Sequence, residues 1–418
     1  MKAVIIGAGK EALHTIQEAK REGIRVAAMD GNAAAAGLKE ADEAIIVNIS
    51  HEEETIEAVK EIKPDFLLTA PIGRYLTTIG AVNDALSLPG ISQKAAENCT
   101  DKWEFHCLLA KEGLRNCQCR LLKAEEEIKI LGKDLQYPAV LKPRYGSGSR
   151  GIFVVTGKAE LEKAMDTLGQ DDSGLKAEDK RGLSEDYVLE ECVAGDEYGV
   201  DGAIIGGQFY LVLLRKKENT PFPARQAVAY FSVLPQDDFY KEAKDYLEKV
   251  VKALKLDECL FHGDLIRTPE GPFAIEVSAR PSGHNLHNLF TPLATGIDLA
   301  KEYICYRIGK SYSFIPKQTK ILMIHYFDLE GRINKVPVPE EVKRGIEEEY
   351  RDPRSSSEEK KMQQNIRLIA WSCSLHPGEW LDKVSDGHSL MGRGYYVLEG
   401  KSQEGLKEAA NKIKSLFW

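Results

Sequence analysis

Short apolar runs alternate with amphipathic segments over the first part of the chain. Runs with the length and composition of buried strands lie at residues 3–8, 25–29, 44–47 and 66–69. The segments 10–22 and 52–62 between them place apolar residues at the spacing of one helix face. This alternation predicts a parallel sheet covered by helices, which forms a Rossmann-like domain at residues 1–95.

The middle of the chain has the shorter repeat that is typical of strands. A helix is predicted at 101–112 and a buried strand at 137–143. Further strands, most of them bounded by glycine turns, are predicted at 187–189, 198–205, 209–214, 259–266 and 272–277. An amphipathic helix is predicted at 239–254, and another helix around 298–306.

We therefore expect a multidomain protein of α/β and α+β class. A central region would span residues 96–310, with a small subdomain at about 110–190, and a mixed α+β subdomain at 311–418 would complete the substrate pocket. The length of 418 residues and the hydrophobic content of 43% agree with several packed units. Polar segments at 170–186 and 351–363 interrupt the pattern.

Composition excludes several classes of function. The net charge of −9 argues against a general nucleic-acid binder and against an anionic membrane surface. No apolar run approaches the roughly 20 residues that a bilayer requires, and the first strand runs into glycine instead of a signal peptide, so we expect a cytoplasmic protein. The eight cysteines include no Cys-x-x-Cys, which disfavours a disulfide framework or a zinc ribbon.

The first chemical motif is a glycine turn near the amino terminus. Gly7 and Gly9 lie between the first strand and the first helix, and Asp30 ends the next strand, as in a dinucleotide-binding fingerprint. A tight turn between strand and helix also requires glycine for purely architectural reasons. From the residues alone, an NAD-dependent oxidoreductase and a cofactor-free Rossmann-like domain remain equal alternatives.

A second glycine motif, at Gly146–Gly151, indicates phosphate binding. Glycine lets backbone N–H groups approach phosphate oxygens closely, and Lys142 just upstream supplies a cation. An exposed hairpin turn would explain the glycines, but it would not explain a lysine at the end of an apolar strand. The chain has no Walker A motif.

Two carboxylates in the predicted hairpin of residues 259–277 indicate a metal site. Asp264 and Glu276 lie on adjacent strands, and hard oxygen ligands together with substrate phosphates are what Mg²⁺ prefers. Arg280 follows closely and is suited to a phosphoryl or carboxylate group. The acidic stretch from Glu190 to Glu197 ends another strand, where backbone and carboxylate groups can bind a nucleoside.

In this order and at these separations, the motifs resemble the ATP-grasp superfamily of carboxylate–amine ligases over residues 1–310. The resemblance implies an ATP-grasp fold, preceded by a Rossmann-like domain that binds no NAD. It assigns Lys102 and Lys142 to the phosphates and Asp264 and Glu276 to the metal. The implied nucleotide contacts are Gly146, Ser147, Gly148, Ser149 and Gly151 in a lid, Glu190, Glu191, Cys192 and Val193 at the adenine, and Glu197 at the ribose.

The stretch Glu276–Gly283 is similar to the branch that contains L-amino acid ligases and carnosine synthase. It departs from the commonest pattern because Ser278 stands where many members have a metal-binding asparagine. The branch implies amide bond formation between amino acids through an acyl phosphate, with ATP and Mg²⁺ or Mn²⁺, with Arg280 and Lys142 as catalytic residues, and often in a homodimer. Residues expected to face the substrates are Arg215, Lys216, Arg225, Ser278, Ser282, His284 and His287.

Two other classes of function remain as alternatives. An NAD-dependent oxidoreductase would use the Gly7 turn, but it leaves the set Lys102, Lys142, Asp264 and Glu276 unexplained. A nucleotide-binding regulator without turnover would keep the nucleotide site and differ from a ligase only in releasing no ADP.

Overall fold

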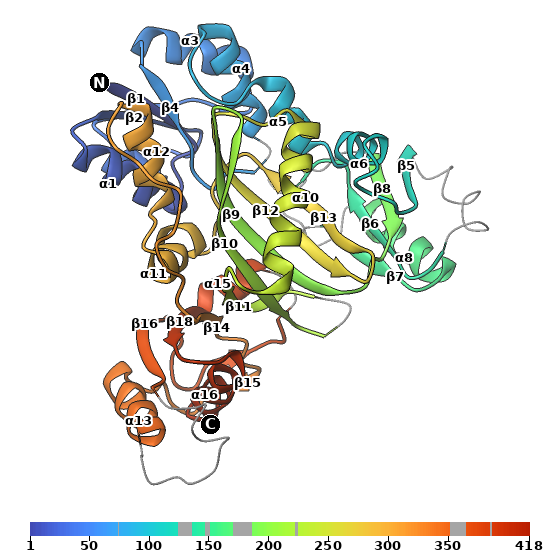
Figure 1. The fold of residues 1–418 in the computed structure, drawn as a ribbon, viewed down its shortest axis with the longest axis vertical. Helices are drawn as coiled ribbons and strands as arrows, with labels where there is room; N and C mark the ends of the chain where they lie inside the picture. Colours follow the sequence, from blue (N-terminus) through green and yellow to red (C-terminus); the bar gives the residue numbers. More distant parts are fainter. Residues whose placement is uncertain are drawn as a thin grey trace.

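The protein consists of several packed sheets and their helices, as a computed structural model shows (Figure 1). The structure describes residues 1–73, 75–123, 136–146, 151–169, 186–221, 225–351, 365–384 and 387–418. Within these ranges, no helix combines the length and the apolar composition needed to span a membrane. The predicted lid residues Ser147, Gly148 and Ser149 and most of the two polar segments lie outside the described residues.

The amino-terminal sheet is parallel, as the sequence pattern predicts. Its strand order is β3-β2-β1-β4. The strands are β1 (Lys2–Ile6), β2 (Arg25–Asp30), β3 (Glu43–Ile46) and β4 (Phe66–Leu68), and the helical segments are η1 (Lys10–Ala12), α1 (Leu13–Arg21), α2 (Ala36–Glu40) and α3 (Glu52–Ile62). Residues 3–6 of the central strand β1 are fully buried, because helices cover both faces of such a sheet.

Three consecutive helices lead from this sheet to the rest of the molecule. They are α4 (Leu76–Leu86), α5 (Gln93–Thr100) and α6 (Lys102–Lys111). Ser92 caps the start of α5, and Asp101 caps the start of α6 by accepting two backbone N–H groups. The Asp101 cap fixes the first residue of α6, Lys102.

A small antiparallel sheet follows, in the order β5-β8-β6-β7. Its strands are β5 (Cys119–Lys123), β6 (Ala139–Pro143), β7 (Phe153–Val155) and β8 (Asp186–Glu191), and α8 (Lys158–Gly169) covers one side. Leu122, Leu141 and Leu189 form its core with the helix residue Leu161. Lys142 and Glu190 therefore lie on two hydrogen-bonded strands.

The largest sheet has eight strands in the order β13-β12-β9-β10-β11-β14-β18-β16. These are β9 (Asp196–Ile205), β10 (Gln208–Asn219), β11 (Ala227–Val233), β12 (Cys259–Thr268), β13 (Gly271–Ser278), β14 (Leu322–Tyr326), β16 (Arg367–Cys373) and β18 (Gly394–Glu399). Strands from the last hundred residues thus continue the central sheet. Helix α10 (Asp238–Leu254) packs on the first half through a stripe that includes Phe239, Leu247 and Leu254.

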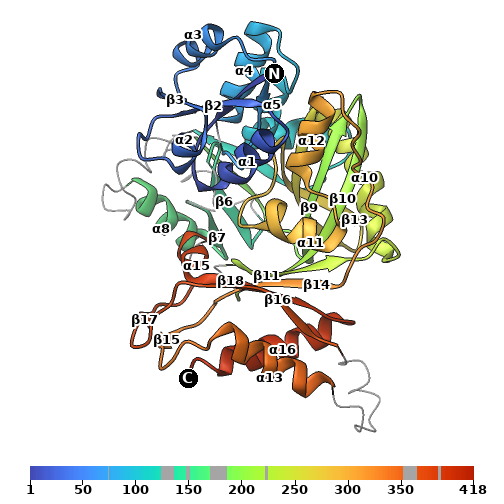
Figure 2. The same cartoon turned by 90° about the vertical axis from the view of Figure 1, so that its left-hand side faces the viewer.

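The remaining helices surround this sheet (Figure 2). They are η2 (Leu286–Phe290), α11 (Thr291–Thr295), α12 (Leu299–Arg307), α13 (Pro339–Arg351), α15 (Gly387–Arg393) and α16 (Gln403–Ser415), with a two-stranded ribbon of β15 (Gly331–Arg332) and β17 (Trp380–Leu381). Figure 2 shows α13 and α16 together beneath the carboxyl-terminal strands. Helix α12 packs against α1, so residues nearly three hundred positions apart meet there.

Gly80 lets α4 and α5 approach each other closely. A Cβ atom at this position would lie 2.5 Å from the Cα of Gln93 and 2.7 Å from the carbonyl oxygen of Ser92. We expect Gly80→Ala to lower the free energy of unfolding by about 1–3 kcal/mol, because two backbones must separate. The helical glycine Gly345 has open space around it, so Gly345→Ala should instead raise stability by up to ~1 kcal/mol. Thermal unfolding of both variants measures these effects. An unchanged Tm for Gly80→Ala would contradict the close packing of α4 against α5.

Candidate active site

Four polar side chains share one face of the β12–β13 hairpin. The register pairs Asp264 with Glu276 and His262 with Ser278. Residues two apart on a strand point to the same side, so His262 and Asp264 lie beside each other, facing Glu276 and Ser278. The structure therefore brings the two predicted metal carboxylates together, and it adds His262, which the sequence analysis did not include.

One oxygen of Asp264 pairs with Lys217, and the other has no partner among the described residues. Its Oδ2 forms an ion pair of 2.6 Å with Lys217, and its Oδ1 is buried without a hydrogen-bond partner among the described residues. Burial alone would raise the pKa of Asp264, but the charge and hydrogen bond of Lys217 and the other charges nearby together outweigh burial, and the pKa is lowered. The side chain is therefore an ionised carboxylate with a free oxygen.

The donor set at this hairpin fits a divalent cation. One ligand atom each from His262, Asp264 and Glu276 lies within 4.8 Å of the others. Metal sites that keep nucleotide phosphates as ligands need only one or two protein carboxylates. The unpaired oxygen of Asp264 would receive a partner if a cation bound there, so the residues present fit Mg²⁺ or Mn²⁺.

Lys142 and Arg115 enclose Glu190 between the small sheet and the hairpin. Lys142 Nζ lies 2.5 Å from Glu190 Oε1, and Arg115 Nη2 lies 2.6 Å from Glu190 Oε2. Arg115 also donates to the carbonyl of Ala274 on β13 and to His106 on α6. Burial would raise the pKa of Glu190, but the charges of Lys142 and Arg115 outweigh it and the pKa is lowered. The predicted adenine carboxylate is thus engaged in a buried charge cluster.

Lys102 lies at the same end of the site. Its Nζ donates to the carbonyl oxygen of Gly146 at 3.1 Å, at the start of the predicted glycine lid. Burial and the charge of Lys142 together lower the pKa of Lys102 to about 8, against the opposing effect of Glu276 and Glu190. The two lysines are therefore close enough to act on the same group of phosphates.

The remaining predicted nucleotide contacts follow β8. Glu191 and Cys192 donate backbone N–H groups to Gln118 and Pro138, which fixes this stretch, and Val193 follows it. Glu197 lies on β9, where its carboxylate forms an ion pair with Arg225. Arg225, predicted to face the substrate, is therefore placed beside the predicted ribose residue.

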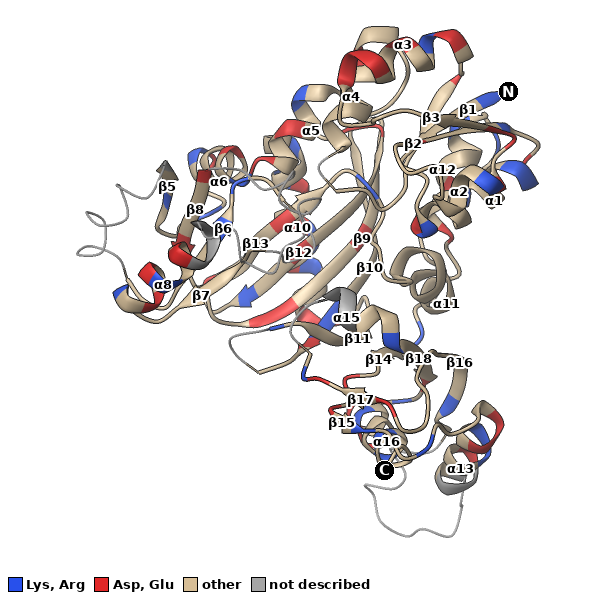
Figure 3. Cartoon of the chain, turned by 180° about the vertical axis from the view of Figure 1, so that it is seen from behind, with Lys and Arg blue, Asp and Glu red and all other residues tan. Residues whose placement is uncertain are grey.

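Two basic residues on β10 that were predicted to face the substrate point in opposite directions. Arg215 is fully buried in an ion pair with Asp201, to which Thr291 also donates. Lys216 instead forms an exposed ion pair with Asp196, at 2.7 Å. Lys217, two residues after Arg215, shares its side of the strand and reaches Asp264. Figure 3 shows acidic and basic segments side by side on the strands of the large sheet.

Several of the residues that follow β13 have buried polar atoms without hydrogen-bond partners among the described residues. Arg280 donates through Nη1 to the carbonyl of Pro281, and its Nε is buried without a partner among the described residues. Ser282 Oγ and His287 Nε2 are likewise buried and unpaired within the described part of the chain. Buried polar atoms are rarely left unsatisfied, so these atoms, which follow the hairpin of the candidate metal site, are candidates for contact with a ligand.

Glu11 reaches this loop from the amino-terminal domain. Its Oε1 accepts the backbone N–H of His284 at 3.1 Å. Burial raises the pKa of Glu11, against the opposing effects of that hydrogen bond and of the positive charge of Arg280. Glu11 was missed in the sequence because its motif was interpreted only through Gly7 and Gly9.

Comparison with known proteins agrees with this arrangement. A family model described as an ATP-grasp domain matches residues 135–287, which include Lys142, Glu190, the β12–β13 hairpin and Arg280. The crystal structure of an L-amino acid ligase from Bacillus licheniformis superposes with a TM-score of 0.76 and 18% sequence identity, covering 99% of this chain and 97% of that one. The chain has the ATP-grasp fold.

Two curated relatives are similar to part of this ATP-grasp chain. The uncharacterized protein y4rH of Sinorhizobium fredii is 27% identical over 254 residues, which cover 60% of this chain and 51% of that protein. Dapdiamide A synthase of Enterobacter agglomerans is 26% identical over 208 residues, which cover 48% of this chain and 47% of that protein. The matched region thus spans about half the length of these relatives.

The Gly7 turn has an architectural role in this ATP-grasp chain. Gly7 has a φ of 89°, and a Cβ atom there would lie 2.7 Å from Ile72 Cδ1. Asp30 accepts the backbone N–H of Ala8 through Oδ2 and that of Asn32 through Oδ1, both at 2.8 Å. Each oxygen of Asp30, the acid of the dinucleotide-binding fingerprint, is thus already bonded to the turn or to its neighbour, which argues against the oxidoreductase alternative.

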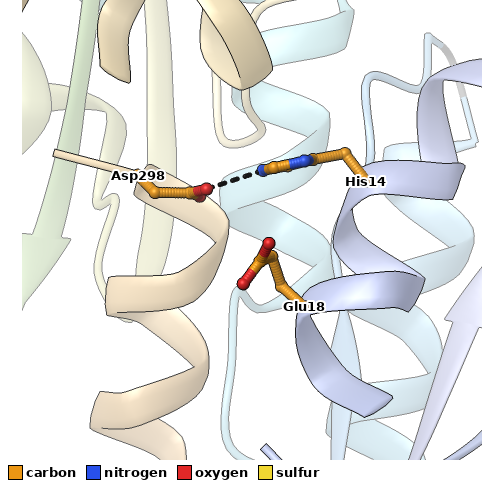
Figure 4. Close-up of side chains that lie close together, drawn as sticks. All are labelled: His14, Glu18 and Asp298. Atoms are coloured by element: carbon orange, nitrogen blue, oxygen red, sulfur yellow. Dashed lines mark hydrogen bonds and ion pairs between the residues drawn. The ribbon is translucent and has the colours of Figure 1, made fainter. Parts of the chain in front are cut away.

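A second group of His, Glu and Asp side chains joins the amino-terminal domain to α12 (Figure 4). His14 Nε2 bonds directly to Asp298 Oδ2 at 2.8 Å, and Glu18 pairs with Arg21. Burial alone would lower the pKa of His14, but the hydrogen bond and charge of Asp298 outweigh it and the pKa is raised. Because His14 is bonded to Asp298 and Glu18 is bonded to Arg21, we interpret the group as a link between α1 and α12.

The lowered pKa of Lys102 predicts proton uptake when nucleotide binds. At about pH 8.5 an amine with a pKa of about 8 is mostly neutral, and nearby phosphates would restore its charge. We expect ADP binding to take up roughly 0.7 proton at that pH. Titration calorimetry in buffers of different ionisation enthalpy measures this number. Lys102→Arg keeps the charge at every pH, so equal uptake in that variant would contradict the assignment.

Proposed function

We propose that this chain is an ATP-dependent carboxylate–amine ligase that acts on amino acids. It would activate a carboxylate as an acyl phosphate, join it to an amine, and release ADP and phosphate. One observation carries the proposal: Lys102, Lys142 and Arg280 converge with Asp264 and Glu276 on one side of an ATP-grasp fold. The printed names of dapdiamide A synthase and the L-amino acid ligase support this reaction class.

The charges in the site are suited to phosphoryl transfer. Attack of a carboxylate on the γ-phosphate spreads negative charge over the transferring oxygens, and nearby cations lower that barrier. Lys102 and Lys142 would supply positive charge at the phosphates. Mg²⁺, held by Asp264 and Glu276, would add charge neutralisation at the same oxygens.

Arg280 would then stabilise the second step. Among the described residues it forms no ion pair, although Glu276, Asp264 and Glu11 all lie close enough to influence its charge. A buried guanidinium without a carboxylate partner is suited to a substrate carboxyl group and to the oxyanion that forms when an amine attacks. Ser282 and His287 lie in the same unpaired group and would line the substrate site.

Glu11 and Arg280 together favour a zwitterionic substrate. Glu11 Oε2 has no partner among the described residues, so the carboxylate can accept an ammonium group while Oε1 keeps its bond to His284. An amino acid presents a carboxylate and an ammonium group a short distance apart. The carboxylate would pair with the Arg280 guanidinium and the ammonium group with the Glu11 carboxylate. We therefore assign the ammonium group of the activated amino acid to Glu11.

The proposal also includes a cytoplasmic location and a homodimer. The first continues the expectation drawn from the sequence, and the second follows the frequent dimerisation of ligases of this kind. Phosphate release with different amino acids identifies the two substrates.

The direct test is phosphate release from Mg·ATP with amino acids offered singly and in pairs. We expect release that requires a particular pair, with a product whose mass equals that of the two acids minus water. In the same assay Glu276→Gln should lower turnover at least about a hundredfold and leave Tm unchanged, because it removes one metal carboxylate without opening a cavity. ADP binding without turnover for every pair would favour the nucleotide-binding regulator, and a full-rate Glu276→Gln would refute the site.

A second test addresses the ammonium contact. Glu11→Gln should raise KM for the activated amino acid about tenfold or more, which is the cost of losing a charge-assisted hydrogen bond of ~1.5–3 kcal/mol. ADP formation with the corresponding acid that lacks the amino group should not change. Glu57→Gln, on the exposed side of α3, is the matched control. Equal losses with both acids would show that Glu11 only supports the fold.

A further inference from the structure

His262 occupies the position opposite Ser278. Ser278 stands where many ATP-grasp members have a metal-binding asparagine, and a hydroxyl on this shorter side chain is a poor replacement for an amide oxygen. The register of the hairpin places His262 directly across from Ser278 and two residues before Asp264. A nitrogen donor therefore stands on the same face as the two carboxylates, beside the position of the missing ligand.

The orientation of the imidazole leaves one nitrogen available. His262 Nδ1 lies 3.2 Å from the carbonyl oxygen of Val200, which accepts hydrogen bonds only, so the proton is on Nδ1 and the lone pair is on Nε2. A histidine that donates its other ring N–H to a backbone carbonyl is the usual arrangement of a metal ligand. Nε2 has no hydrogen-bond partner among the described residues.

The spacing to Asp264 suits an intervening ion better than a direct contact. His262 Nε2 lies 3.9 Å from Asp264 Oδ1, too far for a hydrogen bond. Both atoms lack another hydrogen-bond partner within the described ranges, and Asp264 Oδ1 is buried. Bonds of about 2.1 Å from one cation reach ligands up to about 4.2 Å apart, so a single ion can bind both atoms.

We propose that His262 Nε2 is the third protein ligand, with Asp264 and Glu276, of the divalent cation in this site. The inference rests on the proposed function for the nucleotide that completes the coordination. A site with one imidazole and two carboxylates is softer than an all-oxygen site and favours Mn²⁺ over Mg²⁺. The chain would then use a nitrogen donor from the neighbouring strand at the place where Ser278 offers only a hydroxyl.

The opposing interpretation is that His262 only packs between the carboxylates of Asp201 and Asp264. Its Nδ1 lies 3.8 Å from Asp201 Oδ1, and Asp201 already bonds to Arg215 and Thr291. In that role the imidazole would never contact the ion. The two interpretations differ in whether a nitrogen nucleus is bonded directly to the metal, which spectroscopy detects without any turnover.

The test is pulsed electron paramagnetic resonance of the protein with Mn²⁺ and ADP. We expect electron spin echo modulation from a directly bonded ¹⁴N nucleus in the wild-type protein, and its loss in His262→Asn, which lacks the imidazole. His51→Asn, an exposed histidine on the amino-terminal domain, should keep the signal. Bound Mn²⁺ without nitrogen modulation in the wild type would overturn the proposal even if the variant failed to fold. Modulation that persists in His262→Asn would overturn it as well.

Metal affinity gives a second, independent measurement. In the presence of ADP, His262→Asn should weaken Mn²⁺ binding at least about tenfold and Mg²⁺ binding less, so the preference for Mn²⁺ falls. Equal weakening for both ions would contradict a nitrogen ligand. These readouts do not require catalysis. Nitrogen-bonded Mn²⁺ in a protein that releases no phosphate would keep this inference and reject the ligase.

Discussion

Glu190 connects the parts of the molecule that build the candidate nucleotide site. A buried carboxylate is costly unless cations and hydrogen bonds compensate it, and here Lys142 and Arg115 each bind one of its oxygens. Arg115 also binds the backbone of β13 and the side chain of His106 on α6. The requirement to pair one buried charge thus holds the small sheet, the β12–β13 hairpin and the helix that begins at Lys102 in a single arrangement.

Much of the fold could be predicted, because strands and helices with a buried face leave a periodic pattern. The helix at 52–62 and the strands around Asp264 and Glu276 were predicted within two residues of their observed ends. Helices α4 and α5 were not predicted. Helix α4 is buried along most of its length, so it lacks the polar face that marks an amphipathic helix. Strand β11 was also missed. It is buried on both faces in the middle of the large sheet, so it lacks the alternation of apolar and polar residues that marks a half-buried strand.

Sequence spacing related candidate site residues to each other where the motif is contiguous, and it missed such relations where the motif is not contiguous. Asp264, Glu276 and Arg280 lie within one hairpin, so local spacing was enough to relate them. On β10 the residues predicted to face the substrate are the neighbours Arg215 and Lys216. Alternation puts neighbours on opposite faces, so Lys217 is the residue that shares a face with Arg215. Alternation along β12 would also have identified His262. Glu11 could not be related to His284 from sequence, because 273 residues separate them.

The amino-terminal turn shows how a common architecture acquires a different use. In a dinucleotide-binding domain the acid at the end of the second strand is available to a ribose, whereas here Asp30 binds the backbone of Ala8 and Asn32 and stabilises the turn itself. The helical segment that follows the turn faces the loop after β13 and carries Glu11, while His14 on α1 bonds to Asp298 at the start of α12. A rigid turn is therefore needed at Gly7 even without a dinucleotide, since the position of Glu11 beside Arg280 depends on it.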